Sequence, residues 1–311
     1  SSLSDYRPII LIHLIAKRIT KVLSLRLAPR LGQLVSTNQS AFIAGRCVHD
    51  NFMLVQQTAR QLHNLSVPRV LLKLDIARAF DTVSWPFIID VLRHLGFDRR
   101  WIEWITILLS TASTRILING SPGPPIAPAC GLRQGDPISP MLFTMAIDLL
   151  NSLLLHAHQC GLLQHLTARH AASSISIFTD NVVIFCHPSN HDLRVIRELL
   201  RVFGVASGLR TNFAKCSATP IRCGESELTC INSELAWLSS TFYHLLVHPI
   251  FGSETLGIIL QPIVERLARK LSTWRASLLS RGERLALVRH VLYAIPSHIM
   301  VAIAICLPIL K

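Results

Sequence analysis

The chain has 311 residues, half of them hydrophobic, so it is long and apolar enough to fold around a sizeable core, which argues against a disordered protein. Its 31 basic residues against 18 acidic ones give a net charge of +13, which favours a polyanionic partner, above all nucleic acid. The longest uninterrupted apolar run, Ile299 to Leu310, has 12 residues, fewer than the about 20 that a membrane span needs.

The cysteines argue against a zinc centre. None of the eight forms a C-x-x-C pair, and the set nearest to a zinc pattern is spaced by seven residues, against the usual two to four. That set comprises Cys216, Cys223, Cys230, His244 and His248. We therefore expect free thiols in a reducing compartment. The chain opens with SSLSDYRP, with neither a signal peptide nor an initiator Met, so we expect it to be a piece of something longer.

The first predicted element is a helix from Leu14 to about Leu34, because apolar and basic residues recur there with helical spacing. Its expected apolar face is Ile15, Ile19, Val22 and Leu23. Its basic residues are Lys17, Arg18, Lys21 and Arg26. Because no acidic residue is interleaved with them, a phosphate-binding face and a solvated face are both open interpretations.

A short apolar run, Val70 to Ile76, predicts a buried strand that closes with Asp75. Helices are expected over residues 77–83 and 85–95, followed by a strand and turn at STRILINGSPG. A long helix should then begin with Asp136 as its N-cap and Pro137 as its first residue, because these residue types favour those positions.

The stretch SISIFTDNVVIF, Ser174 to Phe185, has two β-prone runs around a short polar break, which predicts a hairpin with Asp180 and Asn181 at its tip. A helix over 193–206 and an irregular basic segment, GLRTNFAKC, should follow. The last sixty residues have a helical stripe at Leu260, Ile263, Leu267, Leu271 and Trp274. This order predicts an α+β fold with helices on one face of a small antiparallel sheet.

Asp75 and Asp180 stand out because each closes a strand-like run. Two carboxylates brought together at strand ends form an oxygen site suited to Mg²⁺. Taken singly, an aspartate at a strand end is more often a turn former or a helix cap.

The motifs KLDIARAFD, GLRQGDPISP, FTDN and SGLRTNFAK occur in that order and resemble the palm motifs of reverse transcriptases from LINE-type non-LTR retrotransposons. DYRPI (Asp5 to Ile9) and NQSAFIAGR (Asn38 to Arg46) resemble the fingers motifs, and residues 274–296 resemble the thumb. The resemblance covers essentially the whole chain. It implies a right-hand polymerase fold, with fingers and palm interleaved over residues 1–250 and a helical thumb over 251–311.

The resemblance implies an RNA-directed DNA polymerase that works by two-metal nucleotidyl transfer with Mg²⁺, or Mn²⁺ in its place. The implied partners are an RNA template, a DNA primer and deoxynucleoside triphosphates, with no membrane involved. A larger polyprotein that includes an endonuclease is also implied. The expected compartment is the nucleus, otherwise the cytoplasm, and not the secretory route.

The resemblance also implies roles for individual residues. The implied metal ligands are Asp75, the backbone carbonyl of Ile76, and Asp180. Asn181 completes the catalytic tip, and Lys215 would protonate the leaving pyrophosphate. The implied nucleotide-binding residues are Arg7, Ile76, Phe80, Gln134 and Gly135, with Phe80 crowding the sugar 2′ position. Core packing for Phe80, an ordinary turn at Gln134–Gly135 and a solvated Lys215 are the competing interpretations.

The chain departs from the family at two motifs. The hairpin carries Thr179-Asp180-Asn181 where the family has Ala-Asp-Asp, so one negative charge is missing. At an effective dielectric constant near 20, a unit charge at ~4 Å from another is worth about 4 kcal/mol. The segment from Thr241 to Pro249 lacks the family's Tyr-Leu-Gly. The alternative function is therefore a catalytically weakened or inactive pseudo-polymerase that only binds nucleic acid, and an unfolded remnant is a third hypothesis.

Overall fold

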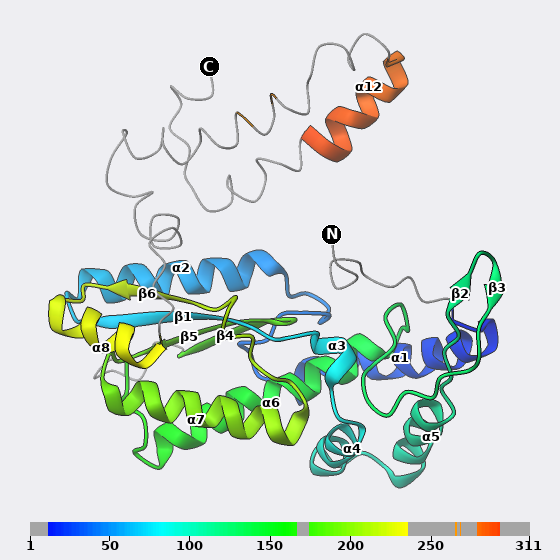
Figure 1. The fold of residues 1–311 in the computed structure, drawn as a ribbon, viewed down its shortest axis with the longest axis horizontal. Helices are drawn as coiled ribbons and strands as arrows, with labels where there is room; N and C mark the ends of the chain where they lie inside the picture. The colour runs from blue at the N-terminus through cyan, green and yellow to red at the C-terminus, as the bar shows by residue number, and fades with distance from the viewer. Residues whose placement is uncertain (1–11, 167–173, 236–264, 266–267, 269–278, 293–311) are drawn as a thin grey trace.

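The computed structural model describes residues 12–166, 174–235, 265, 268 and 279–292. Its centre is a four-stranded antiparallel sheet in the order β4-β5-β1-β6 (Figure 1). These strands are β1 (Arg69–Asp75), β4 (Ile175–Phe178), β5 (Asn181–Cys186) and β6 (Ser217–Ile221). A separate two-stranded ribbon pairs β2 (Leu117–Ile118) with β3 (Ser121–Pro122).

Helices pack on both faces of the central sheet, with α6 and α7 on one side and α2 on the other (Figure 1). The helices are α1 (Leu14–Leu34), α2 (Val48–Asn64), α3 (Ala79–Thr82), α4 (Trp85–His94), α5 (Arg99–Ser110), α6 (Ser139–Gln159), α7 (Asn190–Ser207), α8 (Glu225–Leu235) and α12 (Arg281–Leu287). A π-helical turn, Val288–Leu292, continues α12. The α+β fold with a small antiparallel sheet is confirmed, although its helices cover two faces and not one.

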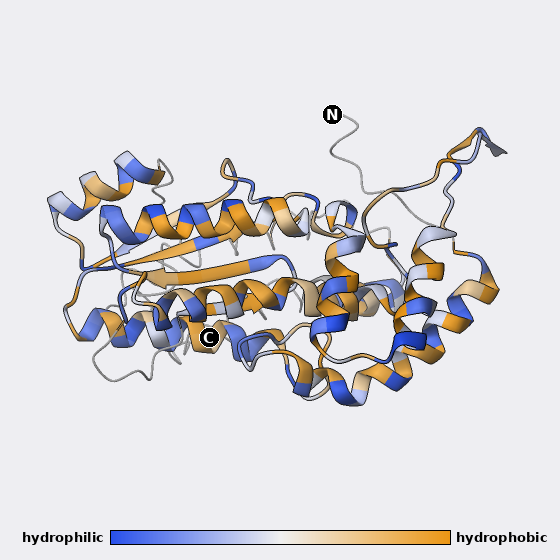
Figure 2. Ribbon diagram, turned by 90° about the horizontal axis from the view of Figure 1, so that it is seen from below, coloured by the Kyte–Doolittle hydropathy of each residue, from blue (hydrophilic) through white to orange (hydrophobic). Residues whose placement is uncertain are grey.

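Strand β1 supplies apolar residues to both faces of the sheet, because both faces are covered. Leu72 and Leu74 belong to the large core cluster with α6 and α7, whereas Leu71 belongs to the smaller cluster with α2. Successive strand side chains point to opposite faces, so the run VLL supplies both clusters at once. The strands are accordingly mostly apolar, while the helices alternate apolar and hydrophilic stretches (Figure 2).

Helix α6 is the only helix in the described ranges that is long and apolar enough to cross a membrane, by length and composition. Of the apolar 18-residue stretch of this helix, 56% is buried inside the protein, as is typical of a core helix. Its buried Asp148 accepts hydrogen bonds from the backbone N–H and the hydroxyl of Ser36 at 2.9 and 2.6 Å. Burial raises the pKa of the Asp148 carboxyl. This contact ties α6 to the segment that follows α1.

The structure confirms several predicted elements within one to three residues at their ends: the helices at 14–34, 85–95 and 193–206, the strand at 70–76 and the hairpin at 174–185. Helices α2, α5 and α8 and strand β6 were not predicted. The stripe from Leu260 to Trp274 falls outside the described residues, as does most of the expected thumb, while α12 lies within its predicted helical region.

The predicted buried face of α1 is wrong. Ile15, Ile19 and Val22 are 48–63% exposed, and only Leu23 of the expected four is buried. The buried apolar residues of α1 are Leu23, Leu27 and Leu31. Apolar residues occur all round this helix, so periodicity could not single out the side that packs against the core.

Two predicted helix starts are also corrected. Helix α6 begins at Ser139, two residues later than expected, and the Asp136 carboxylate instead accepts a hydrogen bond from the backbone N–H of Ile138 at 3.2 Å. The helix expected over 77–83 shortens to α3, because Arg78 adopts a left-handed conformation (φ 47°) that helical residues do not have.

Candidate active site

The tip of the β4–β5 hairpin is a two-residue turn made of Thr179 and Asp180 between the paired residues Phe178 and Asn181. Strand β5 also pairs with β1, in a register that sets Asn181 opposite Asp75. Residues separated by 106 positions in the chain (181 − 75) are therefore direct neighbours in the sheet. Asp180 adjoins this pair through the turn, as the hairpin prediction required.

The side chains of Asp75 and Asn181 project from the same face of the sheet. Directly opposed residues in an antiparallel ladder share a face, and side chains two positions apart along a strand also share one. Asp75 is thus on the face of Leu71, and Asn181 is on the face of Val183 and Phe185, which is the α2 side. The amide of Asn181 consequently lies beside the carboxylate of Asp75. At so short a distance, the replacement of a charged carboxylate by a neutral amide has a large electrostatic effect.

The other edge of β1 is occupied by the SGLRTNFAK motif. The backbone N–H of Asn212 donates to the carbonyl of Asp75 at 2.8 Å, and that of Ala77 donates to the carbonyl of Arg210 at 2.9 Å. Lys215 follows on this segment with an exposed side chain. The structure thus brings the motif that contains Lys215 to the end of β1.

This pairing also orients the main chain of Ile76. Backbone groups of consecutive residues in an extended strand point to opposite edges. Since the carbonyl of Asp75 faces the Asn212 side, the carbonyl of Ile76 faces the side of the β4–β5 hairpin. The proposed metal-binding carbonyl therefore points toward the strand that carries Asn181.

Two glycines fix the loop around α3. Gly131 (φ 84°) and Gly208 (φ 79°) adopt left-handed conformations, and a Cβ at either would overlap a backbone carbonyl, of Asp81 and of Thr82 respectively. Gly131 also donates its N–H to the carbonyl of Val83 at 2.8 Å. The sequence analysis did not single out these two positioning residues. Gly131 nevertheless opens the motif GLRQGDPISP, and Gly208 lies in the motif SGLRTNFAK.

Phe80 is held between two parts of the structure. Its ring stacks on Phe143 of α6, with centroids 4.5 Å apart and an angle of 21°, and its carbonyl accepts a hydrogen bond from the N–H of Leu132 at 2.6 Å. The ring is half-buried, so core packing explains one of its faces. Contact with a nucleotide sugar stays a prediction.

The GLRQG segment lies against the same loop. The amide of Gln134 donates to the Asp81 carboxylate at 3.4 Å, and Gly135 is exposed in a left-handed turn (φ 88°). Asp81 thereby holds Gln134 in place, which is a structural role. Gln134 bonds to Asp81, the neighbour of Phe80, and Phe80 bonds to Leu132 of the same GLRQG segment. These contacts hold Gln134 and Phe80 near each other, as a shared nucleotide site would require. Arg7 and the segment from Thr241 to Pro249 lie outside the described residues.

The donors at the hairpin tip are all oxygens, the kind that hard cations such as Mg²⁺ prefer. They comprise the Asp75 and Asp180 carboxylates, the amide of Asn181 and the carbonyl of Ile76. Among the described residues no group of three or more His, Cys, Asp or Glu side chains is placed to hold a metal ion. The fit to a magnesium site thus rests on the oxygen chemistry of these donors, with two carboxylates where the resembled family has three.

An antiparallel sheet backed by helices, with one carboxylate at the end of β1 and another at the adjoining turn of the β4–β5 hairpin, is the arrangement of a polymerase palm. Residues 1–242 match the model of the family described as reverse transcriptase (RNA-dependent DNA polymerase), and the chain belongs to this family. The family expected from the palm motifs is thereby confirmed.

The chain is similar to proteins of non-LTR retrotransposons. It is 28% identical over 215 residues to the transposon TX1 uncharacterized 149 kDa protein of Xenopus laevis, covering 69% of this chain and 16% of that protein. It is 26% identical over 226 residues to the Pol polyprotein of the type-2 retrotransposable element R2DM of Drosophila melanogaster, covering 73% and 20%. The chain thus spans a fifth or less of the length of these relatives.

A solved structure of telomerase from Candida albicans aligns with a TM-score of 0.48 at 11% identity, covering 68% of this chain and 36% of that one.

Proposed function

We propose that this chain extends a DNA primer along an RNA template, with Asp75 and Asp180 as the metal-binding carboxylates. The observation that supports this most is the pairing of β1 with β5, which sets Asp75 against the hairpin tip that carries Asp180. Membership of the reverse transcriptase family supplies the reaction class.

Each residue has a proposed part in the reaction. Bound Mg²⁺, or Mn²⁺ in its place, would lower the pKa of the primer 3′-hydroxyl and neutralise the triphosphate. Asp75 and Asp180 would hold the cations, helped by the Ile76 carbonyl. Phe80 limits space at the sugar 2′ position, and Gln134 and Gly135 border the base pair. Lys215 protonates the leaving pyrophosphate, and Arg7 contacts the phosphates.

A second candidate function is nucleic-acid binding without catalysis. Asn181 supports it, because the amide faces Asp75 directly and leaves one negative charge fewer to balance two divalent cations. The net charge of +13 serves either function, since binding to a polyanion needs the basic surface and not the carboxylates. For the same reason binding should weaken steeply as salt concentration rises.

The proposed setting is that of the relatives. The Drosophila melanogaster relative is named a Pol polyprotein of a retrotransposable element, which supports a domain that works within a longer chain. We propose that an endonuclease belongs to the same polyprotein and that synthesis on chromosomal DNA takes place in the nucleus.

Primer extension on an RNA template tests both functions. We would compare the chain, Asn181→Asp and Asp75→Ala in Mg²⁺ and in Mn²⁺, with template binding measured on each preparation. Extension by the unaltered chain supports the proposed polymerase. Extension by Asn181→Asp alone would show that the fold binds its substrates and that the amide is the lesion. Binding without extension by either protein would leave only the second function.

A further inference from the structure

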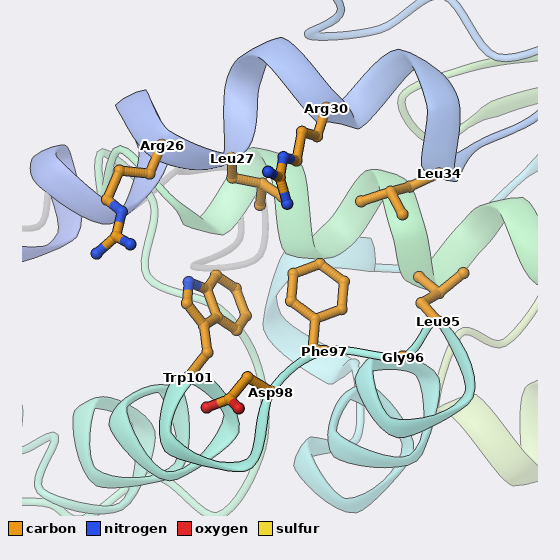
Figure 3. A pocket seen from close by; sticks show the side chains of 9 residues that line it. All are labelled: Arg26, Leu27, Arg30, Leu34, Leu95, Gly96, Phe97, Asp98 and Trp101. Carbon is orange, nitrogen blue, oxygen red and sulfur yellow. The ribbon is translucent and has the colours of Figure 1, made fainter.

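A cavity of about 520 Å³ lies between α1 and the junction of α4 with α5 (Figure 3). Its upper wall in the figure is α1, and its floor comes from Leu95, Gly96, Phe97, Asp98 and Trp101. None of the proposed catalytic or nucleotide-binding residues that the structure describes lines it. The cavity is therefore separate from the hairpin tip, and the proposed polymerase reaction does not account for it.

Two guanidinium groups border the cavity from above. Arg26 and Arg30 stand one helical turn apart on α1, and both extend toward the floor (Figure 3). Neither has a hydrogen bond or an ion pair with any residue in the part of the chain that the structure describes, whereas four other arginines there are paired with glutamate or aspartate. Both charges are thus available to an anion.

The floor is aromatic and fixed in place. The rings of Phe97 and Trp101 lie 4.6 Å apart at 39°, and both are half-buried against the main core. Asp98 is the one acidic residue among the described residues that line the cavity. It caps α5, and its carboxylate accepts a hydrogen bond from the N–H of Arg100 at 2.9 Å. Two guanidinium groups against one carboxylate leave the cavity positively charged.

We propose that this cavity binds one nucleotide of a single-stranded nucleic acid, with its base against Trp101 and Phe97 and its backbone phosphate between Arg26 and Arg30. Aromatic side chains that stack bases beside cationic groups that follow the backbone are the general means of binding single strands. The cavity also has the volume of an ordinary small-ligand site, about 300–1,000 Å³. The inference rests on the proposed function, because it requires a nucleic-acid substrate.

An acidic peptide is the competing occupant. It would satisfy the arginines but has no need of a planar aromatic floor, so dependence on Trp101 separates the two. The strand is favoured because the cavity joins both features in a chain that belongs to a family of nucleic-acid polymerases.

The test is fluorescence anisotropy of a labelled single-stranded oligouridylate with the full chain. Trp101→Leu should raise Kd by about 5- to 100-fold, the range expected for loss of base stacking. Trp104→Leu is the matched control, because Trp104 is on the same helix, is 42% exposed and does not line the cavity. It should change Kd by less than about twofold, as an exposed substitution outside the site.

The arginines are tested with the charge change held constant. Arg26→Gln/Arg30→Gln should weaken binding several-fold more than Lys17→Gln/Lys21→Gln, which removes the same two charges from α1 without touching the cavity. Equal losses in the two double variants would overturn the phosphate site.

Two further comparisons show whether a loss of binding in Trp101→Leu comes from the missing ring or from misfolding. Trp101→Phe keeps an aromatic ring and should bind nearly as the unaltered chain does, and the effect of Trp101→Leu should vanish on an abasic oligonucleotide. Equal Kd values for Trp101→Leu and Trp104→Leu on the oligouridylate would overturn the inference, as would Trp101-independent binding that polyglutamate displaces.

Primer extension on the same preparations separates this inference from the proposed function. Extension with Trp101-independent binding would remove the inference alone. Trp101-dependent binding without extension would support the inference and remove the proposed polymerase alone.

Discussion

Two hairpins with two-residue turns lie within the described part of the chain, and they are stabilised in different ways. The β2–β3 ribbon turns through Asn119 and Gly120, both left-handed (φ 49° and 81°), and its strand residues are exposed. The β4–β5 hairpin turns through Thr179 (φ 57°) and Asp180, and most of its strand residues are buried. The first turn has the residues that its geometry favours, whereas a β-branched residue at positive φ is a conformational outlier.

The difference shows what holds each hairpin. Asn-Gly specifies the outer turn locally, so β2–β3 needs little packing to form. Thr179 disfavours the left-handed conformation that it adopts in the inner turn. The inner hairpin forms nevertheless, because Ile177 and Val182 are fully buried and anchor its strands in the core. Strain that the surrounding structure maintains is common at functional sites. Here it lies in the turn that carries Asp180.

The largest expected effect is on catalysis, which the proposed function locates at the inner hairpin and its partner strand β1. If the chain extends primers, Asp75→Ala should lower the rate about a thousandfold or more, ~4 kcal/mol of barrier, because a ligand shared by both cations is lost. Steady-state primer extension measures this. Template binding and the melting temperature should change little, and parallel loss of binding would point to misfolding instead of a lost metal ligand.

Burial provides the next largest effect. Ile177→Ala should reduce the free energy of unfolding by about 2–5 kcal/mol, because it leaves a cavity under the sheet. Leu117→Ala in the outer ribbon, where that side chain is 59% exposed, should cost no more than about 0.5 kcal/mol. Urea denaturation of both variants checks the contrast, and similar costs would show that the two hairpins are held alike.

The turns themselves should respond with opposite signs. Thr179→Gly should stabilise the protein by up to about 1 kcal/mol, because glycine adopts the left-handed conformation without the Cβ clash. Gly120→Ala should destabilise it by about 1 kcal/mol for the converse reason. Differential scanning calorimetry resolves both shifts. A destabilised Thr179→Gly would mean that the threonine side chain makes a contact that outweighs its backbone strain.

The smallest expected effect is at the far end of the inner hairpin, where His187 follows β5. Burial lowers the pKa of His187 and of His158, although their side chains donate to the carbonyls of His165 and Leu163. As pH falls below about 6.5, the unfolded chain binds protons first, so stability should be flat above that pH and decline below it.

Because both histidines are partly exposed, solvent screening keeps their joint effect small. Urea midpoints at pH 7.5 and 5.5 should differ less in His158→Gln/His187→Gln than in His49→Gln/His94→Gln, which alters two exposed histidines. If the pH dependence of stability were unchanged in His158→Gln/His187→Gln, the loss of stability at low pH would come from other groups.

Local patterns determined a good deal of the structure. Alternating β-prone residues located the hairpin at 174–185, an apolar run located β1, and both carboxylates could be placed at strand ends. Short-range periodicity and turn chemistry are properties of consecutive residues, so the sequence states them directly. Motif order identified the family as well.

Long-range pairing was decided only by the tertiary structure. The sequence did not show that Asn181 lies opposite Asp75, that Asn212 binds the carbonyl of Asp75, or which side of α1 is buried. Nor did it bring α1 to Trp101 to form the Figure 3 cavity. Local patterns state which residues prefer burial or a turn, whereas ladder register and helix packing depend on contacts between segments distant in sequence.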